Sequence, residues 1–244
     1  MILTSASPLA LGLSLGVSVA YAASAAGVTR SDKTRANVLV WLAWAFHGLL
    51  LAWGLWGGQP RFGFAPALSV TAWLVGLVYA IEVYFYPQMR MPWHLPGIGA
   101  AAVLLALLFP GSALNESASA WLPLHWALGI ASYGLFAVAV VHAWLTTRAE
   151  ARMRTAASGH HGLPLLTMER LTFRFVSLGF ILLSATLIAG FFFGNQLYGS
   201  GHAIKWDHKT IFSVLSWVTF AVLMVGRFRF GWRGKQAIRV LYFG

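Results

Sequence analysis

The sequence has no cysteine and few charged residues. Without cysteine the chain forms no disulfide, thiolate metal site or iron–sulfur cluster, and no cofactor can be attached to it through a cysteine sulfur. Only 9% of its 244 residues are charged, whereas 59% are hydrophobic. A soluble domain carries about 25% charged residues. The composition therefore excludes a soluble surface and indicates a protein embedded in lipid.

Several motifs that would point to catalysis are also missing. The sequence has no glycine-rich nucleotide-binding loop, no HExxH pair, no serine nucleophile elbow and no paired carboxylates. We therefore predict no catalytic residue, and a non-enzymatic role is favoured over an enzymatic one.

Seven apolar runs are long enough to cross a membrane, which takes about 17–25 residues. They lie at 8–27, 36–56, 66–86, 97–113, 122–146, 175–193 and 210–226. Another apolar run begins near Ala237, and we expect it to open an eighth span. No Lys or Arg precedes Arg30, so the first run favours an uncleaved span with the N-terminus outside over a signal peptide. The expected fold is an all-α, polytopic transmembrane bundle, with residues 1–244 as a single domain.

The basic residues support this topology. With the N-terminus outside, 14 of the 17 Lys and Arg residues fall in inner loops, and only Arg61, Lys205 and Lys209 fall outside. This is the positive-inside pattern of membrane proteins. It accounts for the net charge of +11 without nucleic acid, which we exclude as a partner. The longest inner loop, 148–174, is expected to be flexible because it contains Ser-Gly-His-His-Gly.

The outer segment 194–209 is rich in chemically useful side chains. It combines two aromatic residues, two histidines and two lysines: Tyr198, Trp206, His202, His208, Lys205 and Lys209. A planar, apolar, dianionic molecule with an open metal site would suit these groups, and haem is such a molecule. A simpler interpretation is an aromatic belt followed by a helix start with Asp207 as its N-cap. The residue types alone leave both interpretations open.

Two motifs connect this segment to a known family. The run Trp206-Asp207-His208-Lys209, with Trp217 further along, resembles the tryptophan-rich signature of the cytochrome c assembly family (CcsA/CcmC/HemX-type). The second motif is Leu122-Pro123-Leu124-His125-Trp126 at the start of a span. His208 stands where the family usually has proline, and the upstream tryptophans are largely replaced. This reduced signature is most similar to the HemX/YpjD-type branch, and the resemblance covers about residues 120–226.

The resemblance implies a non-covalent haem b site at the outer face. It assigns the iron to His125 and to His208, with His202 as the alternative second ligand. The remaining implied roles are an aromatic platform of Trp206, Trp121, Trp126 and Tyr198, propionate contacts from Lys205 and Lys209, and a helix cap at Asp207. His125 and His208 open their spans from the same side, so we expect them at the same membrane level, as two axial ligands require.

Three ionisable residues lie further inside the spans. His47 is expected ~16 Å from the inner face and His142 ~6 Å from it. This difference in depth argues against one haem between them. His47 alone remains a candidate metal ligand, whereas His142 is expected to extend to the inner interface. Glu82 is also expected to reach that interface, near Arg90.

The resemblance therefore implies a membrane protein that binds haem and delivers it, or holds it in a defined redox state. If a haem–protein bond is made, a partner such as apocytochrome c supplies the thiols. The alternative is an accessory or regulatory subunit docked to a larger membrane complex. A transporter is disfavoured because few mid-membrane positions are polar. The expected location is a bacterial inner membrane.

Overall fold

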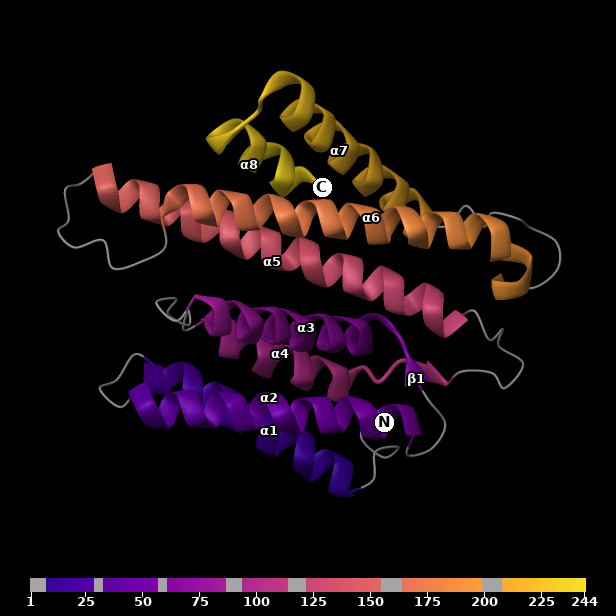
Figure 1. The fold of residues 1–244 in the computed structure, drawn as a ribbon. Coiled ribbons are helices and arrows are strands. Elements are labelled where there is room, and N and C mark those ends of the chain that lie inside the picture. Colours follow the sequence, from indigo (N-terminus) through magenta and orange to yellow (C-terminus); the bar gives the residue numbers. More distant parts are fainter. Residues whose placement is uncertain are drawn as a thin grey trace. The chain divides into compact units, whose positions relative to one another are not determined.

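The computed structural model describes residues 8–28, 33–56, 61–86, 94–113, 122–154, 164–198 and 208–244. These residues form an almost entirely helical protein (Figure 1). The helices are α1 (Pro8–Val28), α2 (Lys33–Trp56), α3 (Phe64–Phe85), α4 (His94–Leu108), α5 (Leu122–Arg154), α6 (Leu165–Tyr198), α7 (His208–Phe230) and α8 (Gly234–Phe243). The expected all-α fold is confirmed.

Five of these helices are long and apolar enough to cross a membrane, namely α1, α3, α5, α6 and α7. Within α2 and α4, apolar stretches at Val38–Gly54 and Leu95–Leu108 are shorter. All seven expected runs coincide with helices, while the number of spans and the outside N-terminus stay predictions. Ser and Thr hydroxyls along these helices donate to the carbonyl four residues earlier, as Ser24, Thr172 and Thr186 do. Such bonds satisfy polar groups inside a single helix, as lipid requires.

The inner loop expected at 148–174 is shorter than predicted. α5 continues to Arg154 and α6 begins at Leu165, so both ends of the expected loop are helical. With 33 and 34 residues, α5 and α6 are each ~50 Å long, well beyond a hydrocarbon core of ~30 Å. Their charged ends therefore extend past the apolar layer as helix, because backbone hydrogen bonds persist where side chains become polar.

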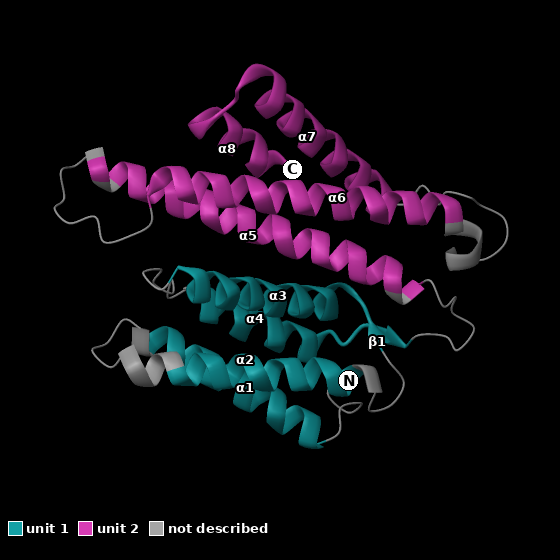
Figure 2. Ribbon diagram, viewed as in Figure 1, with its two compact units in different colours: residues 1–116 teal, residues 117–244 magenta. Residues whose placement is uncertain are grey.

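The chain divides into two compact units (Figure 2). Unit 1 comprises residues 1–116 and contains α1 to α4, with α1 packed against both α2 and α4. Two short strands, β1 (Arg61–Phe62) and β2 (Ser112–Ala113), pair antiparallel next to the helix ends.

A symmetrical tryptophan pair joins α2 to α3 within unit 1. The indoles of Trp44 and Trp73 stack with centroids 5.0 Å apart and planes inclined by 4°. Each indole N–H donates to the other residue's backbone carbonyl, at 3.0 and 3.1 Å. Each ring also lies over a glycine of the opposite helix, Trp44 over Gly76 and Trp73 over Gly48. Glycine at these two positions leaves room for the rings.

Unit 2 comprises residues 117–244 and contains α5 to α8. Its core is apolar and includes Phe136 of α5, Leu183 of α6, Leu223 of α7 and Leu241 of α8. α5 and α6 form a long helix pair, and α7 and α8 pack together beside it (Figure 1).

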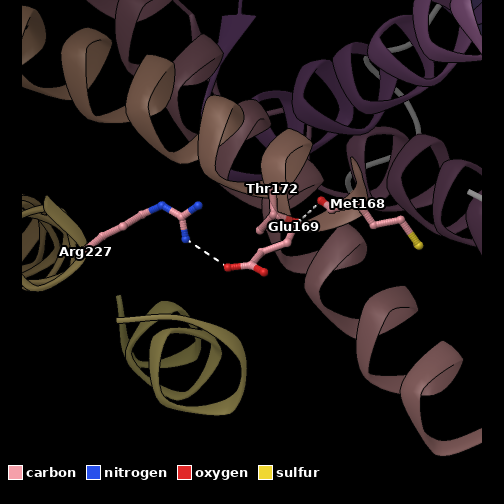
Figure 3. Close-up of polar contacts among 4 residues, drawn as sticks. All are labelled: Met168, Glu169, Thr172 and Arg227. Atoms are coloured by element: carbon pink, nitrogen blue, oxygen red, sulfur yellow. Dashed lines mark hydrogen bonds and ion pairs between the residues drawn. The ribbon is translucent and has the colours of Figure 1, made fainter. Parts of the chain in front are cut away.

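An ion pair connects α6 to the end of α7. Arg227 contacts the Glu169 carboxylate at 3.0 Å, as Figure 3 shows. The Arg227 guanidinium also lies 3.5 Å from the ring centroid of Phe173, a cation–π contact. Beyond this point the chain turns through Gly231 and Gly234, both with positive φ, into α8.

Candidate functional site

His125 lies at the start of α5, on the side that packs against α6. Its imidazole is half-buried, with Cε1 3.4 Å from the position that a Cβ on Gly190 would occupy. The ring also lies within hydrogen-bonding reach of the Thr186 backbone. Metal-ligating histidines commonly use one ring nitrogen for such a hydrogen bond, which orients the other nitrogen toward the metal. The surroundings of His125 therefore suit an oriented ligand.

Two contacts set the alignment of α5 with α7. The hydroxyls of Tyr133 and Ser213 are 3.1 Å apart, and the rings of Phe136 and Phe220 stack with centroids 3.8 Å apart. The later α5 residue meets the later α7 residue, so the two helices run in the same direction.

Measured along the helix axes from these two contacts, His125 and His208 lie at similar levels. His125 lies ~12 Å along α5 before Tyr133, and His208 lies ~8 Å along α7 before Ser213, at 1.5 Å per residue. Measured from the phenylalanine pair, the distances are ~17 and ~18 Å. The helix registers thus agree to within ~5 Å, and both histidines stand at the end of unit 2 where α5 and α7 begin.

The first turn of α7 presents polar groups to its surroundings. His208 and Lys209 are both exposed, and Trp126 on α5 is half-buried. Five of the other predicted site residues lie outside the described residues, namely Trp121, His202, Lys205, Trp206 and Asp207. Tyr198 is the last residue of α6, but its side chain is not among the parts that the structure describes. The proposed platform and cap at these positions stay predictions.

Trp217 of the tryptophan-rich signature lies on α7 and packs against α6. Its indole N–H donates to the Ser184 hydroxyl at 2.9 Å, and its ring stacks on Phe180 with centroids 5.5 Å apart. Trp217 therefore joins the two helices, nine residues along α7 from His208.

His47 occupies a buried polar cluster in unit 1. Its side chain is 1% exposed, with Nε2 2.8 Å from the Ser69 hydroxyl and Nδ1 3.4 Å from the Tyr21 hydroxyl. Both ring nitrogens thus have protein partners, one from α3 and one from α1. To ligate a metal, His47 would first have to give up one of these contacts. The sequence did not point to Tyr21 or Ser69, because neither lies near His47 in the chain.

His142 and Glu82 are more enclosed than expected. His142 is 2% exposed and lies 5.4 Å from Phe175, measured between ring centroids, so it does not extend to an interface. Glu82 is 5% exposed in the last turn of α3, while Arg90 lies outside the described residues. Both expectations assumed that a polar side chain near a span end turns outward, whereas packing within each unit covers these two.

The described residues contain no cluster of three or more His, Asp or Glu side chains that could hold a metal ion by themselves. A porphyrin supplies four of its iron's ligands and asks the protein for only one or two more. The donors available at the start of α5 and α7 are imidazoles with an exposed lysine beside them, which fits that requirement.

The chain is similar to one family of known proteins over most of its length. The sequence profile described as "Cytochrome C assembly protein" matches residues 31–244. The chain is 26% identical over 174 residues to the inner membrane protein YpjD of Escherichia coli K12, covering 68% of this chain and 64% of that protein.

Cytochrome c biogenesis proteins named CcsA also match, over shorter stretches. The protein from Picosynechococcus is 34% identical over 70 residues, covering 29% of this chain and 20% of its own length. The protein from Cyanophora paradoxa is 34% identical over 77 residues, covering 32% and 23%. The chain therefore matches less than two thirds of the length of each of these relatives. No solved structure matches the chain significantly.

Proposed function

Because the chain belongs to the cytochrome c assembly protein family, we propose that it binds haem b non-covalently at the end of unit 2 where α5 and α7 begin. Its role is to receive haem in the membrane and hold it for delivery to the assembly of c-type cytochromes. The observation that carries this proposal is the matched height of His125 and His208 on helices held in register by Tyr133 and Phe136.

Each residue has its own part in this proposed role. His125 and His208 hold the iron from two helices, with His202 as the alternative to His208. A hydrogen bond to the Thr186 backbone would orient the His125 ring, and Lys209 is exposed next to His208, where a cation can pair with a propionate. Bound haem would supply the redox-active iron, and the protein's own residues do no covalent chemistry.

The names of the relatives support the proposed location and partners. YpjD is described as an inner membrane protein and CcsA as a cytochrome c biogenesis protein. We infer that this chain lies in a bacterial inner membrane with its haem site at the outer face. Its partners would be apocytochrome c, which brings the acceptor thiols, or other assembly proteins.

An absorption spectrum of the purified protein, oxidised and then reduced with dithionite, tests the proposal. We expect a Soret band and sharp reduced α and β bands in the wild type after haem reconstitution. His125→Ala should lose these bands, and His208→Ala should weaken or shift them because one axial ligand is gone. His160→Ala removes a histidine from the expected inner loop and should leave the spectrum unchanged.

Two other results would change the assignment. Loss of the bands in His202→Ala, with His208→Ala unaffected, would move the second ligand to His202. A wild type that binds no haem would overturn the proposal, and the accessory-subunit hypothesis would replace it. That hypothesis predicts stable co-purification with a larger membrane complex.

A further inference from the structure

An apolar groove with a volume of about 290 Å³ lies on the side of α7 that faces away from the unit 2 core. Its walls include Trp217, Val218, Val222, Val225, Phe230 and Trp232. Phe220 and Leu223, which pack into the unit 2 core, lie on the other side of the same helix. The groove is therefore formed by α7 and the following turn, and α6 contributes no residue to it.

The length of the groove suits a lipid chain, and Trp232 stands at one end of it. From Trp217 to Phe230 it runs ~20 Å along α7, compared with ~15 Å for half of a hydrocarbon core. The Trp232 ring folds back over Gly226, and the backbone N–H of Trp232 donates to the Gly226 carbonyl at 3.1 Å. A tryptophan in this position is typical of the boundary between acyl chains and headgroups.

Positive charge is concentrated at the Trp232 end. Arg229 lies four residues after Val225 and seven after Val222, so it continues the stripe that lines the groove. Arg229 and Arg233 are exposed and have no ion-pair partner among the residues that the structure describes. Arg227, in contrast, lies on the core side of α7 and contacts Glu169.

We propose that this groove binds one anionic phospholipid, with an acyl chain along Val218, Val222 and Val225 and its phosphate on Arg229 and Arg233. The apolar wall favours the chain, and guanidinium groups bind phosphate oxygens in a bidentate manner. The basic end of α7 faces the cytoplasm by the positive-inside rule, and the cytoplasmic leaflet carries anionic lipid. The site is independent of the haem proposal.

Native mass spectrometry of the full chain in detergent tests this inference. The probes are phosphatidylglycerol and phosphatidylcholine with identical acyl chains. We expect the wild type to retain one phosphatidylglycerol in preference to phosphatidylcholine. Arg229→Gln should weaken phosphatidylglycerol binding about fivefold, and Arg229→Gln with Arg233→Gln on the order of 20-fold, because each basic residue near the surface adds attraction for anionic lipid.

Matched variants separate this site from general attraction to charge. Arg174→Gln removes an exposed charge from α6, outside the groove, and should leave binding within twofold of the wild type. Val222→Phe, which fills the groove, should weaken binding of both lipids, whereas Ile181→Phe at an exposed position of α6 should not. Equal losses in Arg174→Gln and Arg229→Gln would overturn the proposal. So would a dimer of the chain that Val222→Phe dissociates, because a second copy would then occupy the groove.

Discussion

At the scale of single residues, the buried histidine of unit 1 shows how a polar side chain is accommodated in this apolar protein. His47 has a hydroxyl partner on each side, Tyr21 and Ser69, from two other helices. Loss of one partner leaves a buried nitrogen unsatisfied, which costs more than the hydrogen bond itself contributes. The cluster is therefore expected to contribute to the stability of unit 1.

Ser69→Ala tests this expectation. We predict a loss of about 1–3 kcal/mol in the free energy of unfolding, because the His47 Nε2 would stay buried without its partner. Ser18→Ala is the matched control, since the Ser18 hydroxyl donates only to the Ser14 carbonyl of its own helix. Denaturant unfolding in mixed micelles, followed by circular dichroism, measures both. Equal effects of the two substitutions would contradict the assigned role of Ser69.

The sequence could not predict these partners. Ser69 lies 22 residues from His47, and Tyr21 lies 26 residues away. Hydropathy predicts which segments become helices, but nearly uniform apolar helices carry little information about which faces meet. The same limit applies to His125, whose position at a helix start was predictable but whose contact with Gly190 was not.

At the scale of elements, helix existence was predictable and helix ends were not. Each run of apolar residues became a helix because lipid leaves backbone groups no other partner. The ends of α5 and α6 were missed because the residues at 148–154 and 165–174 are partly charged, which suggested a loop. Outside the hydrocarbon, charged residues such as Arg148 and Arg170 occur in helices as well as in loops. Composition therefore does not predict whether such a segment is helix or loop.

The α2–α3 contact gives a prediction at this scale. A Cβ on Gly76 would lie 2.7 Å from Trp44 Cδ1, too close for the stacked indoles to keep their places. We expect Gly76→Ala to destabilise unit 1 by about 1–3 kcal/mol through overpacking. Gly12→Ala adds the same methyl group where no atom lies within 4 Å and should be neutral or stabilising by up to about 1 kcal/mol.

Unfolding monitored by tryptophan fluorescence checks both glycine variants. If Gly76→Ala were as stable as Gly12→Ala, the Trp44–Trp73 pair would not restrict the approach of α2 and α3.

At the scale of the whole molecule, the absence of cysteine makes the topology directly measurable. Any introduced cysteine is the single thiol of the chain. With the N-terminus outside, a cysteine in the segment between α5 and α6 faces the cytoplasm, and one between α6 and α7 faces outward. The distribution of basic residues is the basis of this expectation.

We predict that a membrane-impermeant maleimide labels Ser200→Cys in intact cells and labels Ser158→Cys only after the membrane is opened. The wild type provides the unlabelled control. The reverse pattern would place the start of α5 and α7 on the cytoplasmic side and would move the proposed haem site to the other face. Labelling of both positions in intact cells would show that they lie on the same side, and α6 would then not cross the membrane.

The hydroxyl groups of α6 also bear on how the protein is made. When a segment leaves the translocon, its polar groups must be satisfied within that segment, since its neighbours are not yet in place. Ser184 donates to the Phe180 carbonyl of its own helix and keeps an oxygen lone pair that accepts from Trp217 of α7. α6 can thus enter the bilayer at little polar cost and present an acceptor to the helix that follows. The described contacts of His47 are to α1 and α3, so its burial becomes favourable only when these helices have joined α2, and the polar cluster of unit 1 forms after α2 has entered the bilayer.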